Sequence, residues 1–212
     1  FVNLARQAIC HRSSERMGLL YRLLWRLEHG ERALLEICVD PDVRRAVQMA
    51  KAVRRDVHKM KAFVRFRQVA GVEPEQFVAW FEPQHHVVGA VAPFFRSRFA
   101  SMRWSILTPE CSVHWDGAAL SFAPGATQQS APPGDALDDL WRTYYAHIFN
   151  PARLKVQAMR AEMPVRYWRN LPEARVIKPL VREARQRTGQ MIDADPSPSL
   201  PRAGKWTPLP RS

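Results

Sequence analysis

The spacing of the hydrophobic residues changes twice along this chain, and no other sequence feature limits the fold as strongly. Residues 14–28 and 41–61 repeat apolar side chains at helical spacing, whereas between about residues 62 and 124 the spacing drops to two. Helical spacing returns after residue 135. A block of strands between two blocks of helices predicts an α+β fold.

Capping residues and apolar faces define the N-terminal helices. Asp40 followed by Pro41 predicts a helix that begins at residue 41 and runs to about Lys61, because a carboxylate caps the free amides and proline suits the first turn. Two apolar faces are expected to be buried: Leu19, Leu20, Leu23, Leu24 and Leu27 in the earlier helix, and Val43, Val47, Ala50, Val53 and Val57 in the later one. By the same reasoning we expect four tryptophans in the core: Trp25, Trp80, Trp104 and Trp141.

Five strands are predicted, at residues 62–69, 76–83, 102–107, 111–116 and 119–124. The first two form a predicted hairpin, and the last three form a meander whose second turn contains Asp116-Gly117, a typical tight-turn pair. We therefore expect an antiparallel sheet of about five strands, surrounded by N- and C-terminal helices. Residues 1–192 are predicted to form this single domain, and residues 193–212, rich in proline and serine, a linker or disordered tail.

The charge of the chain favours a polyanionic partner. The sequence has 32 Lys and Arg against 20 Asp and Glu, a formal net charge of +12, which favours nucleic acid over an acidic membrane surface. Residues 111–140 contain neither Lys nor Arg, so the positive charge is concentrated in the helical blocks. The alternative is a basic protein without a polyanionic partner.

The cysteine pattern and the absence of several known motifs argue against several classes of site. Cys10, Cys38 and Cys111 are far apart and form no CxxC pair, so neither a zinc finger nor an iron–sulfur site is predicted, and the pattern suits a reducing cytoplasm. No apolar run is long enough to span a bilayer, so no membrane partner is expected. The sequence lacks a Gly-rich phosphate loop, a nucleophile elbow and an HExxH motif, and we expect neither a metal nor another cofactor.

One polar cluster is a candidate for catalysis. Glu82, His85 and His86 lie at the end of the second predicted strand, and His58 precedes the first strand. Because a hairpin brings such segments near each other, these four residues are candidates for general acid–base catalysis. The alternative is a helix cap with surface histidines.

Aromatic and basic residues are interleaved from Leu140 to Ala174, a composition typical both of nucleic-acid surfaces and of helical cores with a solvated flank. Tyr167 and Trp168 fit either core packing or base stacking. Four basic residues, Arg175, Lys178, Arg182 and Arg185, share one face of the last predicted helix. The residues predicted to contact nucleic acid are Arg54, Arg55, Lys59, Arg65, Arg67, Arg142, Tyr145, Arg153, Lys155, Arg166, Trp168 and Arg169.

Four blocks of sequence resemble an uncharacterised bacterial domain family linked to DNA metabolism and DNA repair: HKMKAFVRFR (58–67), AWFEPQHHVV (79–88), residues 94–117 and residues 140–174. In that family the domain occurs beside a DNA-repair radical-SAM protein, or fused ahead of a uracil-DNA glycosylase of the UdgX type. The resemblance therefore implies DNA and one of these enzymes as partners. This chain has neither a glycosylase motif nor the cysteines for an iron–sulfur cluster, so such chemistry would belong to the partner.

Three hypotheses are open at this point. A DNA-binding accessory module for a repair enzyme would contact phosphates through the basic residues named above. An enzyme acting on damaged or modified nucleotides would use His58, Glu82, His85 or His86, with aromatic rings holding a flipped base. A protein–protein adaptor would dock the partner enzyme without contacting DNA, and would present an exposed apolar patch.

Overall fold

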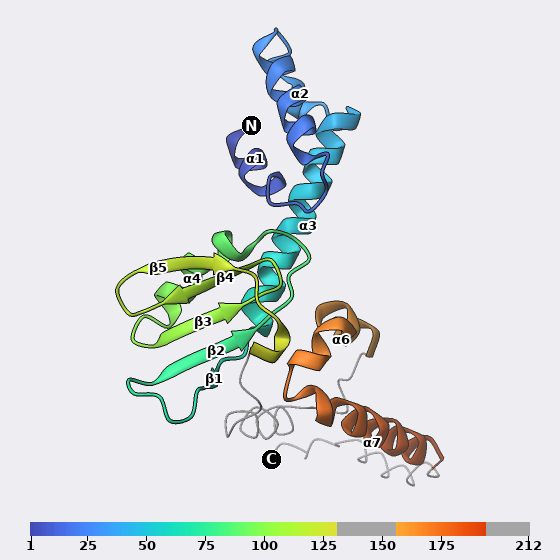
Figure 1. Cartoon of the computed structure of the whole chain (residues 1–212). Helices are drawn as coiled ribbons and strands as arrows, with labels where there is room; N and C mark the ends of the chain where they lie inside the picture. Colours follow the sequence, from blue (N-terminus) through green and yellow to red (C-terminus); the bar gives the residue numbers. More distant parts are fainter. Residues whose placement is uncertain (131–155, 194–212) are drawn as a thin grey trace, which may run out of the picture.

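The computed structural model describes residues 1–130 and 156–193 and confirms the α+β class (Figure 1). The helices are α1 (Val2–Ala8), α2 (Arg16–Glu28), α3 (Pro41–Phe63), α4 (Val88–Arg98), α6 (Val156–Glu162) and α7 (Ala174–Asp193), with short 3-10 turns η1 (Leu34–Glu36), η2 (Gln128–Ser130) and η4 (Val165–Asn170). The strands are β1 (Arg67–Gln68), β2 (Gln76–Trp80), β3 (Arg103–Leu107), β4 (Cys111–Trp115) and β5 (Leu120–Pro124). Trp141, the nominated residues Arg142, Tyr145, Arg153 and Lys155, and the tail from residue 194 lie outside the described residues.

The five strands form one sheet in the order β1-β2-β3-β4-β5. The predicted hairpin and meander are confirmed, because β1 pairs antiparallel with β2, and β4 pairs antiparallel with both β3 and β5. The sheet is mixed rather than wholly antiparallel, since β2 and β3 run parallel from Gln76↔Arg103 to Trp80↔Leu107. The connection between them includes α4, and a connection of that length can return the chain to the same end of the sheet.

The first strand is much shorter than the predicted residues 62–69. Helix α3 continues to Phe63, where the amide of Val64 still donates to the carbonyl of Met60 at 3.1 Å, and β1 contains only Arg67 and Gln68. Val64 is buried and the Phe66 ring lies 5.3 Å from the Phe99 ring. The apolar residues that suggested a strand therefore end the helix and enter the core.

Helix α3 is shared by two hydrophobic cores. Val43 and Met49, in its N-terminal half, pack with residues of α1, α2 and η1, whereas Val53 and Met60 pack with the sheet, α4 and the start of α7. A helix of 23 residues is about 34 Å long at 1.5 Å per residue. Figure 1 shows the result: α1 and α2 lie along the upper part of α3, and the sheet lies beside its lower part.

The start of α3 is as predicted, but its buried face differs at two positions. The Asp40 carboxylate accepts hydrogen bonds from the amides of Asp42 and Val43, at 2.9 and 3.0 Å, which is the expected cap. Val47 is 46 % exposed, so the prediction that it is buried is wrong. Asp56 is 3 % exposed and occupies the same face as Val53 and Met60.

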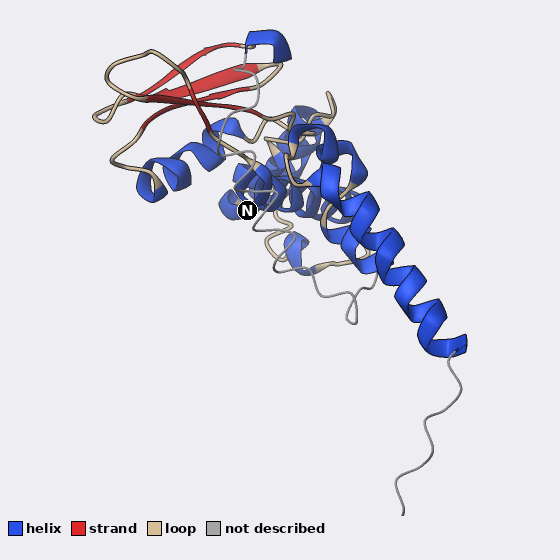
Figure 2. Cartoon of the chain, turned by 90° about the horizontal axis from the view of Figure 1, so that it is seen from below, coloured by secondary structure: helices blue, strands red, loops and turns tan. Residues whose placement is uncertain are grey.

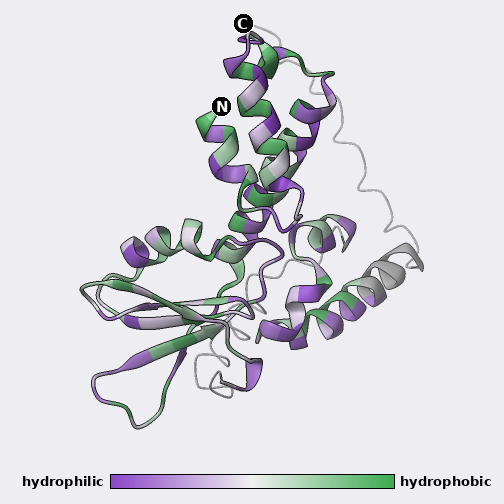
Figure 3. Cartoon of the chain, turned by 45° about the horizontal axis from the view of Figure 1, so that its top comes forward, coloured by the Kyte–Doolittle hydropathy of each residue, from purple (hydrophilic) through white to green (hydrophobic). Residues whose placement is uncertain are grey.

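Helix α2 has an apolar face on each side. Leu19, Leu20 and Leu23 are buried against the N-terminal half of α3. Leu24 and Trp25 were predicted to be buried and are 42 % and 52 % exposed, because Leu24 lies at the edge of the buried face and Trp25 lies on the far side of the helix from Leu23. Together with the exposed Met17 and Tyr21 they form what we call the α2 apolar stripe: Met17, Tyr21, Leu24 and Trp25. Figure 3 shows hydrophobic and hydrophilic residues side by side along the helices of this region.

Helix α4 covers one face of the sheet (Figure 2). Trp104 of β3 is 2 % exposed, and its ring lies 6.1 Å from Phe95 of α4 and 5.9 Å from Phe66. These edge and tilted contacts suit aromatic rings. These contacts join α4, β3 and the segment after α3 into one core. Phe81 and Val87 of the segment 81–87, and Tyr167 of η4, belong to the same core.

Candidate functional site

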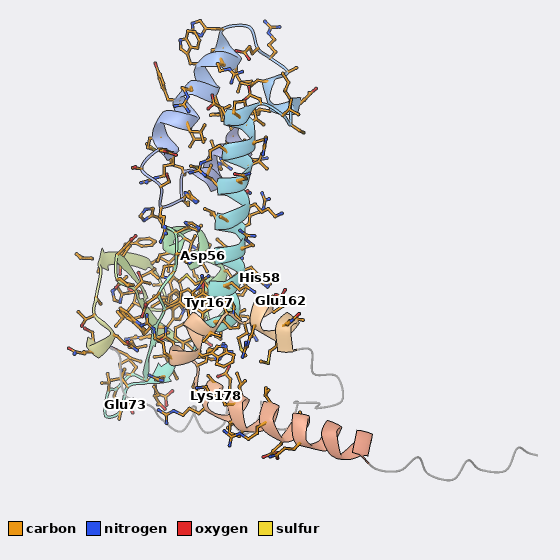
Figure 4. All side chains as sticks on the ribbon, turned by 90° about the vertical axis from the view of Figure 1, so that its right-hand side faces the viewer. Asp56, His58, Glu73, Glu162, Tyr167 and Lys178 are labelled. Carbon is orange, nitrogen blue, oxygen red and sulfur yellow. The ribbon has the colours of Figure 1, made fainter. Side chains whose placement is uncertain are left out.

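A buried carboxylate connects three segments at the centre of the molecule. Asp56 Oδ2 accepts hydrogen bonds from the amides of Gln84 and His85, both at 2.8 Å, and Asp56 Oδ1 accepts one from the Tyr167 hydroxyl at 3.2 Å. In Figure 4 the side chains of Asp56 and Tyr167 point toward each other from α3 and η4. Because a buried carboxylate is stable only when its oxygens are hydrogen-bonded, Asp56 holds α3, the segment 81–87 and η4 together.

Burial and the nearby Arg166 shift the pKa values of Asp56 and Tyr167. Burial raises the pKa of the Asp56 carboxyl, and the two amide hydrogen bonds partly oppose this shift. Burial also raises the pKa of the Tyr167 hydroxyl, against the hydrogen bond that it accepts from Arg166 Nη2 at 3.0 Å. The Arg166 guanidinium lies 4.7 Å from the centre of the Tyr167 ring. Arg166 is therefore engaged with the buried tyrosine, although its side chain is exposed.

His85 is a neutral, buried histidine. Its Nδ1 accepts a hydrogen bond from the amide of Arg12 at 3.3 Å, and its ring lies 4.4 Å from that of His11. Burial, followed by the charges of His11 and Arg12, lowers the pKa of His85 to about 4. Nδ1 must be unprotonated to accept the amide proton, so this hydrogen bond also favours the neutral ring. At neutral pH His85 joins the α1–α2 connection to the segment 81–87.

The four residues nominated for catalysis lie in three separate environments. His58 is exposed on α3, two residues beyond Asp56 and on a different side of the helix (Figure 4). Glu82 accepts hydrogen bonds from Trp80 Nε1 at 2.9 Å and from Arg169. His86 is exposed and its Nδ1 lies 2.6 Å from a carboxylate oxygen of Glu110. The contacts therefore do not bring a shared acid–base pair together from these four residues.

Most of the nominated cations that the structure describes already contact other parts of the chain. The following contacts involve them: Arg54 with Gln7 Oε1 at 2.7 Å, Lys59 with Glu162 at 3.2 Å, Arg65 with Glu173 at 2.8 Å, Arg166 with Tyr167, and Arg169 with Glu82. The Arg65–Glu173 pair is buried, with side chains 13 % and 4 % exposed. Arg67 is half-buried on β1, and Arg55 is exposed on α3. Lys59 thus attaches α6 to α3, and Arg65 attaches the segment before α7 to the residues that follow α3.

A different set of cations gathers around Trp168. Two adjoining surface depressions, of about 380 and 490 Å³, share Arg160, Trp168 and Lys178 in their walls. We call the two together the cationic groove. The remaining lining residues are Met159, Ile177, Val181 and Arg182 in the first depression, and Val165, Arg169, Leu171, Ala174 and Arg175 in the second. Five of its described lining residues are Arg or Lys and none is Asp or Glu.

The two aromatic residues between Arg166 and Arg169 have different environments. Tyr167 is 2 % exposed, with its ring 5.2 Å from that of Phe81, so it belongs to the core. Trp168 is half-buried, and its Nε1 donates to the carbonyl of Met163 at 3.0 Å while the ring lines the cationic groove. Of the two roles that the sequence left open, core packing or base stacking, Tyr167 has the first. Trp168 forms part of the wall of the cationic groove.

Arg160 belongs to the basic and aromatic stretch that the sequence indicates as a candidate surface, whereas Arg175, Lys178 and Arg182 were not among the nominated binding residues. The signal for these three was present, because they repeat at helical spacing on α7. What the sequence did not indicate is that this face of α7 meets Arg160 of α6 and Trp168 of η4 in one groove. Asp56 was also missed, although a carboxylate on the apolar stripe of a helix is a signal of a buried polar role.

Two further findings apply to residues 1–130 and 156–193. No three His, Cys, Asp or Glu side chains in this part of the chain lie close enough together to hold a metal ion. None of the described helices is both long and apolar enough to cross a membrane. Cys10, Cys38 and Cys111 are free, and burial raises the pKa of the Cys10 thiol.

The fold and the site define a basic α+β domain in which a buried carboxylate positions η4 beside a cationic groove. Comparison with known proteins gives the family: the chain belongs to the family described as a domain of unknown function, DUF4130, whose model matches residues 14–173. The chain matches no curated protein and no solved structure. The matched range includes α2, the sheet, Asp56 and Trp168, and ends at Glu173, immediately before α7.

Proposed function

We propose that this chain is a DNA-binding accessory module that acts in DNA repair. The observation that supports this function is the cationic groove, in which five Arg or Lys and no carboxylate line the described walls around Trp168. Positioned guanidinium and ammonium groups are what phosphate contacts require. No ion pair joins Arg160, Arg175, Lys178 or Arg182 to another described residue, so these four are available to phosphates.

The repair context and the partner enzyme are proposed from the family resemblance. There the domain accompanies a radical-SAM repair protein or precedes a UdgX-type uracil-DNA glycosylase, and either enzyme would act on the DNA that the groove holds. Such a module needs a second surface for the enzyme. The α2 apolar stripe is a suitable one, because exposed clusters containing Trp and Tyr are typical of protein interfaces.

The same stripe supports the adaptor hypothesis as a second candidate function. Residues 15–42 carry six Asp or Glu and four Arg, a formal net charge of −2 in a chain of +12. Arg22 and Arg26 are paired there with Asp42 and with Glu31 and Asp40. A DNA backbone would be repelled from this region, whereas a partner helix with an apolar seam and basic flanks would be attracted. Figure 1 places α2 and α7 at opposite ends of the molecule, so one surface does not obstruct the other.

DNA binding is tested by fluorescence anisotropy with the full 212-residue chain and a labelled oligonucleotide across a series of salt concentrations. We expect binding at low salt that weakens steeply as salt rises, because contacted phosphates release counterions. The double variant Lys178→Gln/Arg182→Gln should reduce the slope of log K against log salt by about 1.4–1.8. Arg32→Gln/Arg44→Gln is the matched control, because it removes the same charge from exposed positions near the N-terminus, Arg32 between α2 and η1 and Arg44 on α3.

Two results would exclude DNA binding by the groove. One is the absence of measurable affinity at low salt. The other is an equal loss of affinity in the groove variant and in the control variant, because net charge rather than the groove would then explain binding. If binding is absent but a partner enzyme is held by the wild-type chain and released by Trp25→Lys, the adaptor function replaces the DNA-binding one.

A further inference from the structure

We infer that the cationic groove takes single-stranded DNA, with an unpaired base stacked on Trp168. This inference rests on the proposed function and specifies its substrate. Three properties of the groove suit an unpaired strand: an apolar and aromatic lining, a fixed tryptophan, and cations around it.

The floor of the groove suits a base better than it suits a duplex. Trp168 is flanked by Met159, Ile177 and Val181 in one depression and by Val165 and Leu171 in the other. In a duplex the faces of the bases are stacked inside and the surface presents phosphates, sugars and base edges, so an apolar floor would gain no contact. An unpaired base has two exposed π-faces and stacks on aromatic side chains in single-strand-binding proteins.

The size of the groove is consistent with this substrate. Each depression, at about 380 and 490 Å³, falls in the range of roughly 300–1,000 Å³ typical of ligand pockets. Trp168 lines both depressions, so the ring lies where they meet. Successive nucleotides of one strand can therefore occupy the two depressions on either side of the tryptophan.

Trp168 is held in place before any ligand binds. Its Nε1 donates to Met163 O at 3.0 Å, and the preceding residue, Tyr167, is buried and hydrogen-bonded to Asp56. The ring also packs against the larger hydrophobic core. Because little side-chain freedom remains to be lost, stacking on this ring costs less than stacking on a mobile surface residue.

The cations are arranged to follow a strand past the tryptophan. Arg175, Lys178 and Arg182 lie on one face of α7 and span about 10 Å along its axis, at 1.5 Å per residue. Arg160 reaches the groove from α6. Arg169, which is paired with Glu82, lines the second depression from η4. Cations without an ion pair to a described residue therefore line both depressions: Arg182 the first, Arg175 the second, and Arg160 and Lys178 both.

The test compares three probes in anisotropy titrations with the full chain at low salt. They are a labelled 12-mer of dT, a strand of the same length and charge whose sugars lack bases, and a duplex of the same length. We expect the dT strand to bind more tightly than the other two. Trp168→Leu should weaken dT binding about 5- to 150-fold, which corresponds to about 1–3 kcal/mol per stacked base, and should leave the base-free strand unaffected.

Two further variants separate stacking from charge. Trp168→Phe keeps an aromatic face and should retain most of the preference for bases. Lys178→Gln/Arg182→Gln should weaken the dT strand and the base-free strand by the same factor, because it removes phosphate contacts only. Circular dichroism of each variant checks that the chain is folded.

Equal affinity of the wild-type chain for the dT strand and the base-free strand would overturn the inference, and so would tighter binding of the duplex. Both results use unmodified protein and do not depend on how a Trp168 variant folds. In either case salt-dependent binding would remain and the proposed function would stand. If none of the three probes binds at low salt, the proposed function itself fails, and the two failures are thereby distinguished.

Discussion

Removal of the Asp56 carboxylate should destabilise the protein more than any exposed substitution on the same helix. Asp56→Ala leaves the amides of Gln84 and His85 and the Tyr167 hydroxyl without their acceptor. A buried donor without a partner costs about 1–3 kcal/mol, so three of them cost about 3–9 kcal/mol. The variant also removes the unfavourable burial of a charge, which is the main cause of the raised pKa of Asp56. We expect a net loss of about 3–5 kcal/mol in the free energy of unfolding.

Asp56→Asn distinguishes the hydrogen bonds from the charge. The amide oxygen can still accept from both backbone amides, and the charge burial is relieved, so the loss should be about 1–2 kcal/mol. Unfolding in urea, followed by circular dichroism, gives the free energies. His58→Ala, two residues along α3 and exposed, is the control and should change stability by less than about 0.5 kcal/mol. An equal loss of stability in Asp56→Ala and His58→Ala would refute the structural role of the buried carboxylate.

Three further predictions concern stability. Arg65→Ala should cost about 3–5 kcal/mol because it leaves Glu173 buried and unpaired, and the double variant Arg65→Met/Glu173→Leu should recover most of that loss in the same urea assay. The free energy of unfolding should fall by up to about 3 kcal/mol as pH drops from 6.5 to 4. In this window the unfolded chain gains a proton on His85 before the folded chain does, because the folded pKa of His85 is about 4. In His85→Gln the free energy of unfolding should lack this dependence on pH. Gly125→Ala should lower the melting temperature, because a Cβ there would collide with the backbone of Pro109; an unchanged melting temperature would contradict the close approach.

The features that sequence predicted well depend on neighbouring residues. The cap of α3 by Asp40 is local chemistry, and so is the turn at Asp116, whose carboxylate accepts from the amides of Ala118 and Ala119, both at 2.7 Å. Gly117 has the positive φ of 98° that this turn needs. Strands β3, β4 and β5 follow from the alternation of apolar residues between such turns.

The features that sequence missed depend on pairs of residues far apart in the chain. Lys59 and Arg65 are separated from their acidic partners by 103 and 108 residues, and periodicity contains no information about such pairing. In the sequence, Asp56 looks like a polar interruption of the apolar face of α3 that contains Val53 and Met60. Only the positions of the segment 81–87 and of Tyr167 show why a carboxylate is stable there. Trp25 was misassigned for a related reason, since an apolar residue on a helix can belong to a second face.

Ion pairs with carboxylates reduce the share of the +12 net charge that can act on DNA. Arg26 is held by Glu31 and Asp40, and Lys59, Arg65 and Arg169 each contact a carboxylate. A paired cation must lose that partner before it neutralises a phosphate, so its net contribution to binding is small. Within the described residues, four groove cations have no such ion pair. Four phosphate contacts with a single strand predict a salt slope of about −2.8. A slope near −1 would mean that the strand follows only part of the groove, whereas a slope much steeper than −2.8 would require cations beyond these four.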